Sequence, residues 1–140
     1  AQLAALRHAL WPESPAEHHA GELDTIFAGA WSRIFPYTIF VAETEAGELV
    51  GFADVTMRSY AEGCDAGRPA GYLEGWYVAD GWRRRGIGRE LVRAAEAWAR
   101  AQGCTEMGSD TWLDNEVSQR AHAALGFEVT DRIITFRKGL

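Results

Sequence analysis

The sequence lacks several features that mark common protein classes. It has only two cysteines, Cys64 and Cys104, which lie far apart and in no CxxC or Cys/His ligand spacing. We therefore expect two free thiols in a reducing compartment and no structural metal. No segment approaches the roughly 18 to 20 consecutive apolar residues of a membrane helix, and no basic-then-apolar leader opens the chain. These absences favour a cytoplasmic protein that does not act at a membrane.

Basic residues are also scarce. The 140 residues contain 14 Lys and Arg against 20 Asp and Glu, which gives a formal net charge of −6. This balance argues against nucleic acid as a partner and suits a cationic one. Many of the arginines nevertheless crowd into one short segment, at Arg83, Arg84, Arg85, Arg89 and Arg93. A local anion-binding site within an acidic domain explains both observations.

The length of 140 residues fits one domain, 1–140, with its own core. Apolar periodicity and turn residues predict helices and strands that alternate along most of the chain. The expected helices are 2–10, about 17–30, 87–102 and 115–125, and the expected strands are 37–42, 49–57, 72–78, 105–109, 127–129 and 132–137. A turn at 45–47 joins the first two strands, and 60–71 is expected to be a loop. This order predicts one mixed sheet with helices on both faces.

The strongest chemical signal is a basic, glycine-rich turn between a strand and a helix. The strand that ends at Val78 is followed by Asp80-Gly81-Trp82 and then by the run from Arg83 to Gly88. Backbone N–H groups at a helix start lack internal partners and the macrodipole adds positive potential, so this turn suits a phosphate group. Gly86 and Gly88 would let a pyrophosphate approach the main chain without an intervening Cβ. The alternative is a basic helix cap whose glycines serve a tight turn; neither GxxxxGK[ST] nor GxGxxG is present.

Two motifs in order resemble the GNAT superfamily of N-acetyltransferases. Arg83-x-x-Gly86-x-Gly88 after an apolar strand looks like the family's acetyl-CoA pyrophosphate motif, and a second motif matches at Asn115, Ser118, His122, Gly126 and Phe127. The resemblance implies an α/β fold of the α+β type with a mixed, mostly antiparallel sheet that splays to admit the pantetheine arm. It also implies a homodimer, and a first strand before Gln2 that we expect to be missing from this sequence. The acetyl-CoA contacts that it implies are Trp76, Tyr77, Val78, Arg83, Arg84, Arg85, Gly86, Ile87, Gly88, Arg89 and Asn115.

One position departs from the family pattern. His122 stands where the family usually has a tyrosine, the presumed proton donor to the departing thiolate. Helical spacing places Asn115, Ser118 and His122 on one face. An imidazole can donate that proton, although a helical histidine is more often simply packed or hydrated.

A narrower resemblance, to the aminoglycoside 6′-N-acetyltransferases, spans nearly the whole chain. The segments that carry it are Leu10-Trp11-Pro12, Gly51-Phe52-Ala53-Asp54, Gly63-Cys64-Asp65, Tyr72-Leu73-Glu74-Gly75, Ser109-Asp110-Thr111, Asn115 to Gln119 and Leu125-Gly126-Phe127-Glu128. The matching positions imply an aminoglycoside pocket lined by Trp11, Tyr60, Glu74, Asp110 and Asp131. A polycationic sugar suits such a set, because carboxylates bind its ammonium groups and aromatic faces bind its rings.

The carboxylates are also candidates for the general base. Strict alternation would place Glu74 on one strand face with Trp76 and Val78, toward the cofactor cleft, unless it is simply a charge on a solvated face. Asp110 follows a predicted strand, where α/β folds place sites, but it could equally cap a turn, as could Asp131. Direct attack of the amine on acetyl-CoA is expected, because neither cysteine has a recognisable general base. An acetyltransferase for another amine, such as a polyamine or peptide N-terminus, and a non-catalytic acyl-CoA-binding module are the alternatives.

Overall fold

The computed structural model describes residues 1–32 and 34–140. It divides into two compact units, Ala1–Ser109 and Asp110–Leu140. The first unit contains α1 (Gln2–Leu10), α2 (Ala16–Phe27), β1 (Tyr37–Glu43), β2 (Leu49–Arg58), β3 (Ala70–Val78), the 3-10 turn η1 (Asp80–Trp82), α3 (Ile87–Ala101) and β4 (Met107–Ser109), and the second contains α4 (Glu116–Ala124). The four helices predicted from sequence are confirmed to within a few residues.

The sheet lies wholly in the first unit, with strand order β1-β2-β3-β4. β1 and β2 form an antiparallel hairpin whose turn contains Gly47 at φ 81°, and β2 and β3 are antiparallel as well. β4 runs parallel to β3 and pairs with it at Gly71–Leu73. The sheet is therefore mixed and mostly antiparallel, as the sequence predicts.

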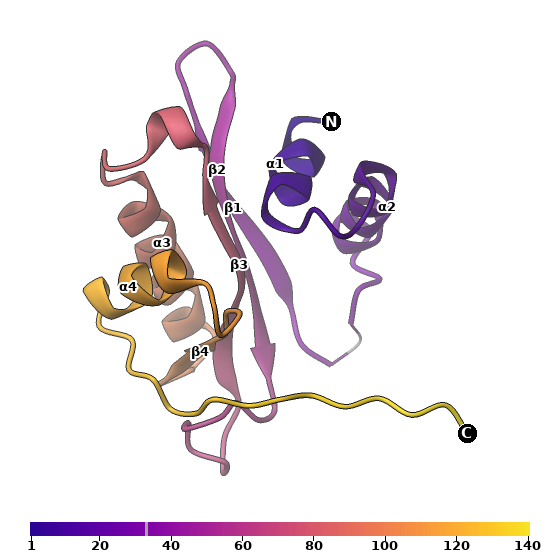
Figure 1. Cartoon of the computed structure of the whole chain (residues 1–140), viewed down its shortest axis with the longest axis vertical. Coiled ribbons are helices and arrows are strands. Elements are labelled where there is room, and N and C mark those ends of the chain that lie inside the picture. The colour runs from indigo at the N-terminus through magenta and orange to yellow at the C-terminus, as the bar shows by residue number, and fades with distance from the viewer. Residues whose placement is uncertain (33) are drawn as a thin grey trace. The chain divides into compact units, whose positions relative to one another are not determined.

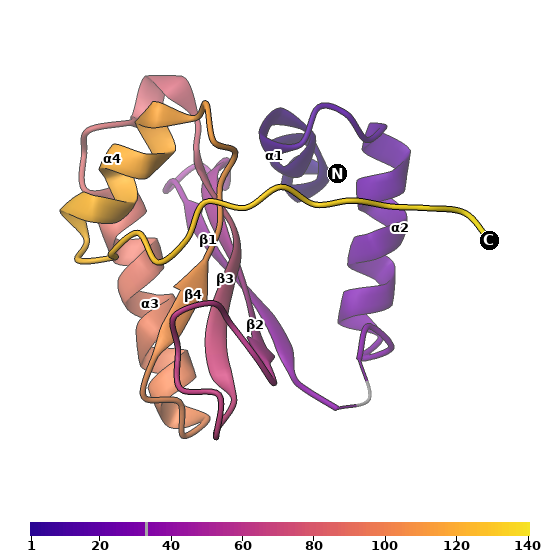
Figure 2. The ribbon, with the colours of Figure 1, turned by 60° about the horizontal axis from the view of Figure 1, so that its bottom comes forward.

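Helices cover both faces of this sheet (Figures 1 and 2). α3 packs on one face through Leu91, Val92, Ala95 and Ala99, while α1 and α2 lie over the other. The largest fully buried apolar side chains, Phe52, Val55, Leu73 and Val92, form the core between these layers. Gly71 is needed at the α3 face, because a Cβ there would lie 2.7 Å from the Cβ of Ala99.

A bulge in β3 changes the expected alternation of its side chains. Asp54 pairs with Gly75 and Val55 pairs with Leu73, so Glu74 is an extra residue without a partner position on β2. A bulge of this kind reverses the facing of the residues that follow it. Glu74 consequently faces α1 and α2, whereas Trp76 packs against Gly88 of α3. The prediction that Glu74, Trp76 and Val78 share one face was wrong for this reason.

Two other predictions from sequence need correction. The segment expected to be a loop as far as residue 71 ends earlier, because Ala70 and Gly71 already pair with Arg58 and Met57 of β2. The strands expected at 127–129 and 132–137 are absent from the described residues. Val129, Ile134 and Phe136 are 71%, 76% and 91% exposed, and a strand forms only where a neighbouring strand accepts its hydrogen bonds.

The second unit has well-defined ends to its helix. Asn115 caps α4, with Oδ1 accepting a hydrogen bond of 3.0 Å from the backbone N–H of Ser118. Gly126, at φ 90°, ends the helix, and the Phe127 N–H donates to the His122 carbonyl at 3.1 Å. Both ends follow the residue types seen in the sequence. Across residues 1–32 and 34–140, none of the helices combines the length and apolar character needed to cross a membrane.

Candidate active site

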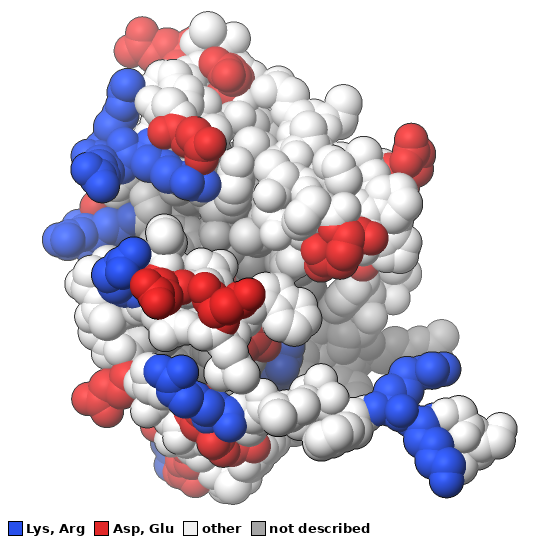
Figure 3. Space-filling view, viewed as in Figure 1, with Lys and Arg blue, Asp and Glu red and all other residues white. Residues whose placement is uncertain are grey.

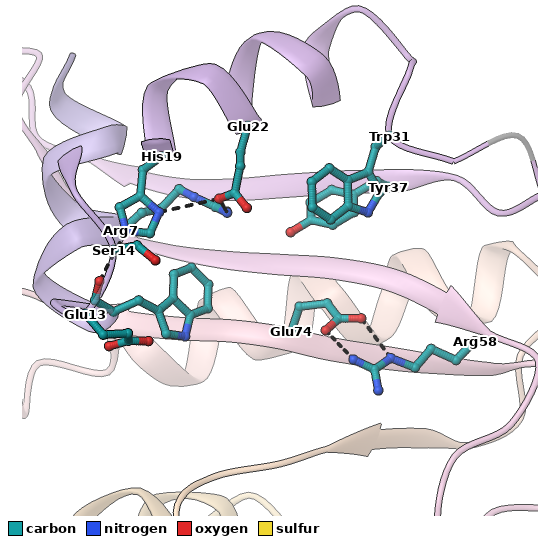
Figure 4. Close-up of a pocket in the computed structure, with 10 residues that line it drawn as sticks. Arg7, Glu13, Ser14, His19, Glu22, Trp31, Tyr37, Arg58 and Glu74 are labelled. Carbon is teal, nitrogen blue, oxygen red and sulfur yellow. Dashed lines mark hydrogen bonds and ion pairs between the residues drawn. The ribbon is translucent and has the colours of Figure 1, made fainter. Parts of the chain in front are cut away.

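A cavity of about 400 Å³ opens on the face of the sheet that α1 and α2 cover. Figure 4 shows side chains from both helices, from their connecting segments and from three strands converging on it. The lining residues are Arg7, Trp11, Glu13, Ser14, His19, Glu22, Trp31, Tyr37, Arg58 and Glu74. Aromatic rings and carboxylates dominate this set, and the volume is that of a small-molecule site.

Trp11 lies at the end of α1 and is held from several sides. Its carbonyl accepts a hydrogen bond from Nε2 of His19 at 3.2 Å, and the two rings stack with centroids 6.0 Å apart. The guanidinium of Arg7 lies 4.9 Å from the centre of the indole, in cation–π range. Beneath the indole, Gly75 of β3 leaves the space that a Cβ would fill. The ring is therefore fixed as part of the cavity wall.

A buried ion pair anchors α1 to the sheet below the cavity. Arg7 is 4% exposed and Asp54 is fully buried, and the two side chains form an ion pair. Arg7 also bonds to Glu22 of α2 at 3.0 Å, and the Tyr37 hydroxyl donates to Asp54 at 3.0 Å. Burial raises the pKa of Tyr37 to about 12; the nearby Arg7 opposes this shift and Glu74 adds to it. The phenol therefore stays protonated as a donor across the neutral range.

Glu74 reaches the cavity from the bulge in β3. Both of its carboxylate oxygens accept hydrogen bonds from Arg58 of β2, at 2.9 Å from Nε and 2.6 Å from Nη2 (Figure 4). The guanidinium of Arg58 also lies 3.5 Å from the centre of the Tyr72 ring. Glu74 thus has an ionic partner and a defined orientation within the cavity.

The strand that carries Glu74 opens toward its C-terminal end. Among the described residues, the pairing of β4 with β3 stops at Leu73 and Ser109. Residues 75–78 of β3 continue to pair with β2 beyond this point. This separation of β3 from β4 agrees with the splayed sheet that the sequence resemblance implies.

The basic turn after β3 contains two residues with positive φ. Arg84, at φ 61°, is the non-glycine residue with positive φ among those described, and Gly86, the N-cap of α3, has φ 82°. A Cβ on Gly86 would meet no atom within 4 Å, so open space lies in front of it. Successive N–H groups in such a turn, at a helix start, form a seat for an anion.

Gly88 also serves the packing of α3 on the sheet. A Cβ at this position would lie 3.0 Å from the Trp76 ring, so the missing side chain lets α3 pack closely against β3. The arginine side chains nearby are partly engaged: Arg83 pairs with Asp80 at 2.8 Å and donates to the Val78 carbonyl at 2.9 Å, and Arg85 lies over Trp82. Figure 3 shows the resulting concentration of basic side chains over η1 and the beginning of α3.

The remaining candidate residues lie in the second unit. Asp110 is exposed and opens that unit, and Asp131 is exposed with Oδ1 accepting from the N–H of Arg132 at 2.7 Å. His122 is half-buried: its Nδ1 lies 2.8 Å from the Ser118 carbonyl and its ring packs edge-on against Phe127. Ser118 and His122 do share a helix face, as their spacing predicts.

The structure brings Trp11 and Glu74 together in one cavity. Tyr60 is 55% exposed in the segment after β2 and is not one of the ten lining residues. The other eight lining residues were not expected from the sequence: Arg7, Glu13, Ser14, His19, Glu22, Trp31, Tyr37 and Arg58. The sequence did carry two signals for the ion pair. Arg7 falls among the apolar positions Leu3, Leu6 and Leu10, and Asp54 lies within an apolar strand.

Both cysteines carry free thiols, as expected. Burial raises the pKa of Cys64 and of Cys104, and Glu106 adds to the shift at Cys64. A raised pKa keeps the thiols protonated and poorly nucleophilic.

Known proteins resemble this chain along its whole length. Residues 3–127 match the acetyltransferase (GNAT) family. An aminoglycoside N(6′)-acetyltransferase type 1 of Klebsiella aerogenes is 43% identical over 136 residues, covering 97% of this chain and 88% of the relative, and one of Serratia marcescens is 42% identical over 137 residues, covering 97% and 90%.

Among solved structures, that of AAC(6′)-Iy in complex with the bisubstrate analog CoA-S-monomethyl-acetylneamine superposes with a TM-score of 0.86 at 37% identity, covering 99% of this chain and 90% of the other. The match with the family spans both sequence motifs, and the fold agrees with that of the solved relatives. The chain therefore belongs to the acetyltransferase (GNAT) family, within the group of the aminoglycoside N(6′)-acetyltransferases.

Proposed function

We propose that this protein transfers an acetyl group from acetyl-CoA to the 6′ amine of aminoglycoside antibiotics and so confers resistance to them. One observation carries the proposal: β3 supplies Glu74 to an aromatic and acidic cavity and, four residues later, enters the turn suited to a pyrophosphate. A single strand thus links an acceptor site to a donor site. The names of the relatives, at up to 43% identity, give the acceptor class.

The cavity has the chemistry that a polycationic sugar needs. Glu13, Glu22 and Glu74 contribute carboxylates, and the two arginines of the lining pair with two of them, Arg7 with Glu22 and Arg58 with Glu74, so the acidic side chains outnumber the basic ones. Trp11, Trp31 and Tyr37 supply flat apolar surfaces against which sugar rings can stack. The sequence resemblance implies that Tyr60, Asp110 and Asp131 also contact the acceptor.

The turn after β3 fits a coenzyme A pyrophosphate. Positive φ at Arg84 and Gly86 orients the backbone, and the residues proposed to hold the pyrophosphate run from Arg83 to Arg89. By the sequence resemblance, backbone groups of Trp76, Tyr77 and Val78 would pair with the amides of the pantetheine arm, and Asn115 would contact acetyl-CoA. When bound, acetyl-CoA supplies an activated thioester; an amide near Val78 would polarise its carbonyl.

The protein's task in the reaction is to orient and deprotonate the amine. The attacking nitrogen forms a C–N bond to the acetyl carbon, the C–S bond breaks, and the nitrogen loses a proton. Asp110 or Glu74, directly or through a water, would accept that proton, and His122 would return one to the leaving thiolate. The raised pKa values of both thiols support direct transfer over a covalent relay through cysteine.

We further propose that the chain acts as a single GNAT domain, forms a homodimer and works in the cytoplasm, where acetyl-CoA is available. The sequence resemblance supports the dimer. Size-exclusion chromatography with light scattering measures the mass in solution, and a species at the monomer mass of 15.5 kDa at working concentration would contradict the dimer.

The proposed function is tested by following thiol release from acetyl-CoA with kanamycin or tobramycin as acceptor. An otherwise matched aminoglycoside that carries a hydroxyl in place of the 6′ amine is the control. We expect turnover with the 6′ amine and little with the 6′ hydroxyl. Equal turnover with both, or turnover only with polyamines or peptide N-termini, would overturn the assignment.

A further inference from the structure

Arg58 makes two contacts that fix it beside Glu74. Its guanidinium donates to both oxygens of Glu74, at 2.9 and 2.6 Å, in a bidentate arrangement. The same guanidinium lies 3.5 Å from the centre of the Tyr72 ring and forms a cation–π interaction with it. Glu74 is the extra residue of the bulge and Tyr72 lies two residues before it, so Arg58 contacts both the bulge and the regular part of the strand that precedes it.

The bulge makes such a bridge necessary. Glu74 is the one residue of β3 that stands outside the register with β2, so the ladder does not by itself hold its side chain in place. A glutamate has three side-chain torsions, and an unbound one samples many orientations. The Arg58 fork selects the one that points into the cavity (Figure 4).

We infer that Arg58 is a positioning residue for the acceptor amine: it clamps Glu74 in the orientation that receives a substrate ammonium group. This inference rests on the proposed function, because it takes Glu74 as a contact of the aminoglycoside. A carboxylate has about four acceptor positions, so an ammonium can bind Glu74 while Arg58 occupies two of them.

A simpler electrostatic role predicts the opposite result. If Arg58 were only a cation competing with the substrate for Glu74, removing it would strengthen acceptor binding. If Arg58 orients Glu74, removing it weakens acceptor binding even though the cavity becomes more negative. The side chain of Arg58 is 42% exposed, so solvent screens its repulsion of the substrate, and we expect orientation to dominate.

The test is a double-mutant cycle on the Michaelis constant for kanamycin. Arg58→Met should raise that constant about tenfold, the size of one lost charge-assisted contact, with a smaller change in kcat and none in the Michaelis constant for acetyl-CoA. Arg58→Lys keeps the charge but loses the planar fork and the stack, and it should resemble Arg58→Met. In a Glu74→Gln background, Arg58→Met should have no further effect. Arg100→Met, which removes an arginine from the exposed pair with Glu96 on α3, is the matched control and should leave all constants unchanged.

Several results would overturn the inference. A lower Michaelis constant in Arg58→Met, with Arg58→Lys like wild type, would show a competing charge. Additive effects of Arg58→Met and Glu74→Gln would show that Arg58 does not act through Glu74, and a fall in melting temperature with equal losses toward acetyl-CoA and kanamycin would show a purely structural role. If Arg58→Met does not fold, Arg58→Lys decides. Wild-type protein that neither binds nor acetylates kanamycin would overturn the proposed function and this inference together, whereas normal wild-type turnover with additive variants would overturn this inference alone.

Discussion

The indole of Trp11 lies directly on the backbone of β3 at Gly75. A Cβ on Gly75 would come within 2.7 Å of Cζ2 of Trp11, closer than real Cβ contacts allow, and would also approach Leu10 at 3.3 Å. Gly75 therefore serves close packing, and it does so at the residue next to Glu74. Adjacent residues of β3 therefore determine two features of the cavity: Gly75 makes room for the Trp11 ring, and Glu74 supplies the carboxylate.

Gly75→Ala should displace Trp11 and disturb the acceptor site. We expect a loss of about 1–3 kcal/mol in the free energy of unfolding from overpacking, together with a raised Michaelis constant for kanamycin. Gly21→Ala is the control, because a Cβ at this α2 position meets nothing within 4 Å, and it should stabilise the protein by roughly 0.5–1 kcal/mol. For each variant, denaturant unfolding gives the free energy of unfolding and steady-state kinetics give the Michaelis constant for kanamycin. A Gly75→Ala protein with normal stability and kinetics would show that the indole moves aside without consequence.

Gly86 should be essential for acetyl-CoA binding. Gly86→Val forces a β-branched side chain into φ 82° and places it in the open space in front of the helix start, so acetyl-CoA should bind at least about tenfold more weakly. Gly63→Val is a matched control, since Gly63 has nearly the same φ of 76° and lies away from the turn. Both variants suffer similar backbone strain, but calorimetry should find weaker acetyl-CoA binding only for Gly86→Val. Equal affinities in the two variants would remove the pyrophosphate assignment.

Stability should fall at alkaline pH because of Tyr37. Burial raises its pKa from 10.0 to about 12, so the folded state favours the neutral phenol. The resulting stabilisation is fully present below pH 10 and is lost as the pH rises toward about 12. Tyr37→Phe lacks this component, although it also loses the hydrogen bond to Asp54. Denaturant unfolding of both proteins across this range should show the wild type losing more stability than the variant; parallel losses would contradict the shift.

Local patterns in the sequence predict most of the fold. The spacing of Leu3, Leu6 and Leu10 predicts α1, and the sequence of Gly86 and Ile87 predicts the start of α3. The β3 bulge cannot be recognised in the sequence. One extra residue leaves the apolar pattern of the strand unchanged, but it reverses the face of the sheet on which the following side chains lie. Long-range pairing, and not periodicity, decides which face Glu74 occupies.

The acceptor cavity shows the same limit. Trp11 and Glu74 were assigned through family resemblance, but Arg58 and Tyr37 became visible only when β1, β2 and β3 were placed side by side. These side chains come from positions 16 and 37 residues away from Glu74, and no local pattern connects them. Their roles follow from tertiary contacts such as the Arg58 fork.

His122 should assist turnover without being indispensable. A thiolate is a good leaving group and water can supply its proton, so His122→Ala should retain measurable activity, and His122→Tyr should be tolerated. Ser118 and Phe127 pack against the ring, so circular dichroism should first establish that each variant is folded. Steady-state kinetics with saturating acetyl-CoA give the comparison. Complete loss of activity in a folded His122→Ala protein that still binds acetyl-CoA would show that the imidazole is an obligatory acid.

Amide variants should distinguish the carboxylates that bind the antibiotic from the carboxylate that acts as the base. Glu74→Gln, Asp110→Asn and Asp131→Asn should each weaken kanamycin use by roughly 1.5–3 kcal/mol, the size of a charge-assisted hydrogen bond, with acetyl-CoA affinity nearly unchanged. If Glu74, oriented by Arg58, only binds the substrate ammonium, Glu74→Gln should mainly raise the Michaelis constant. The variant that lacks the base should also lose kcat at saturating antibiotic, which we expect of Asp110→Asn.

Glu96→Gln removes one negative charge from the exposed pair with Arg100 and controls for net charge. Added salt should raise the Michaelis constant more for kanamycin than for a small monoamine, because screening acts on each charge pair. Equal salt sensitivity for the two acceptors, together with normal kanamycin kinetics in Glu74→Gln and Asp110→Asn, would contradict an aminoglycoside acceptor and would still leave an acetyl-CoA-dependent transferase of another amine. Loss of kcat in Glu74→Gln with a normal Asp110→Asn would instead make Glu74 the base.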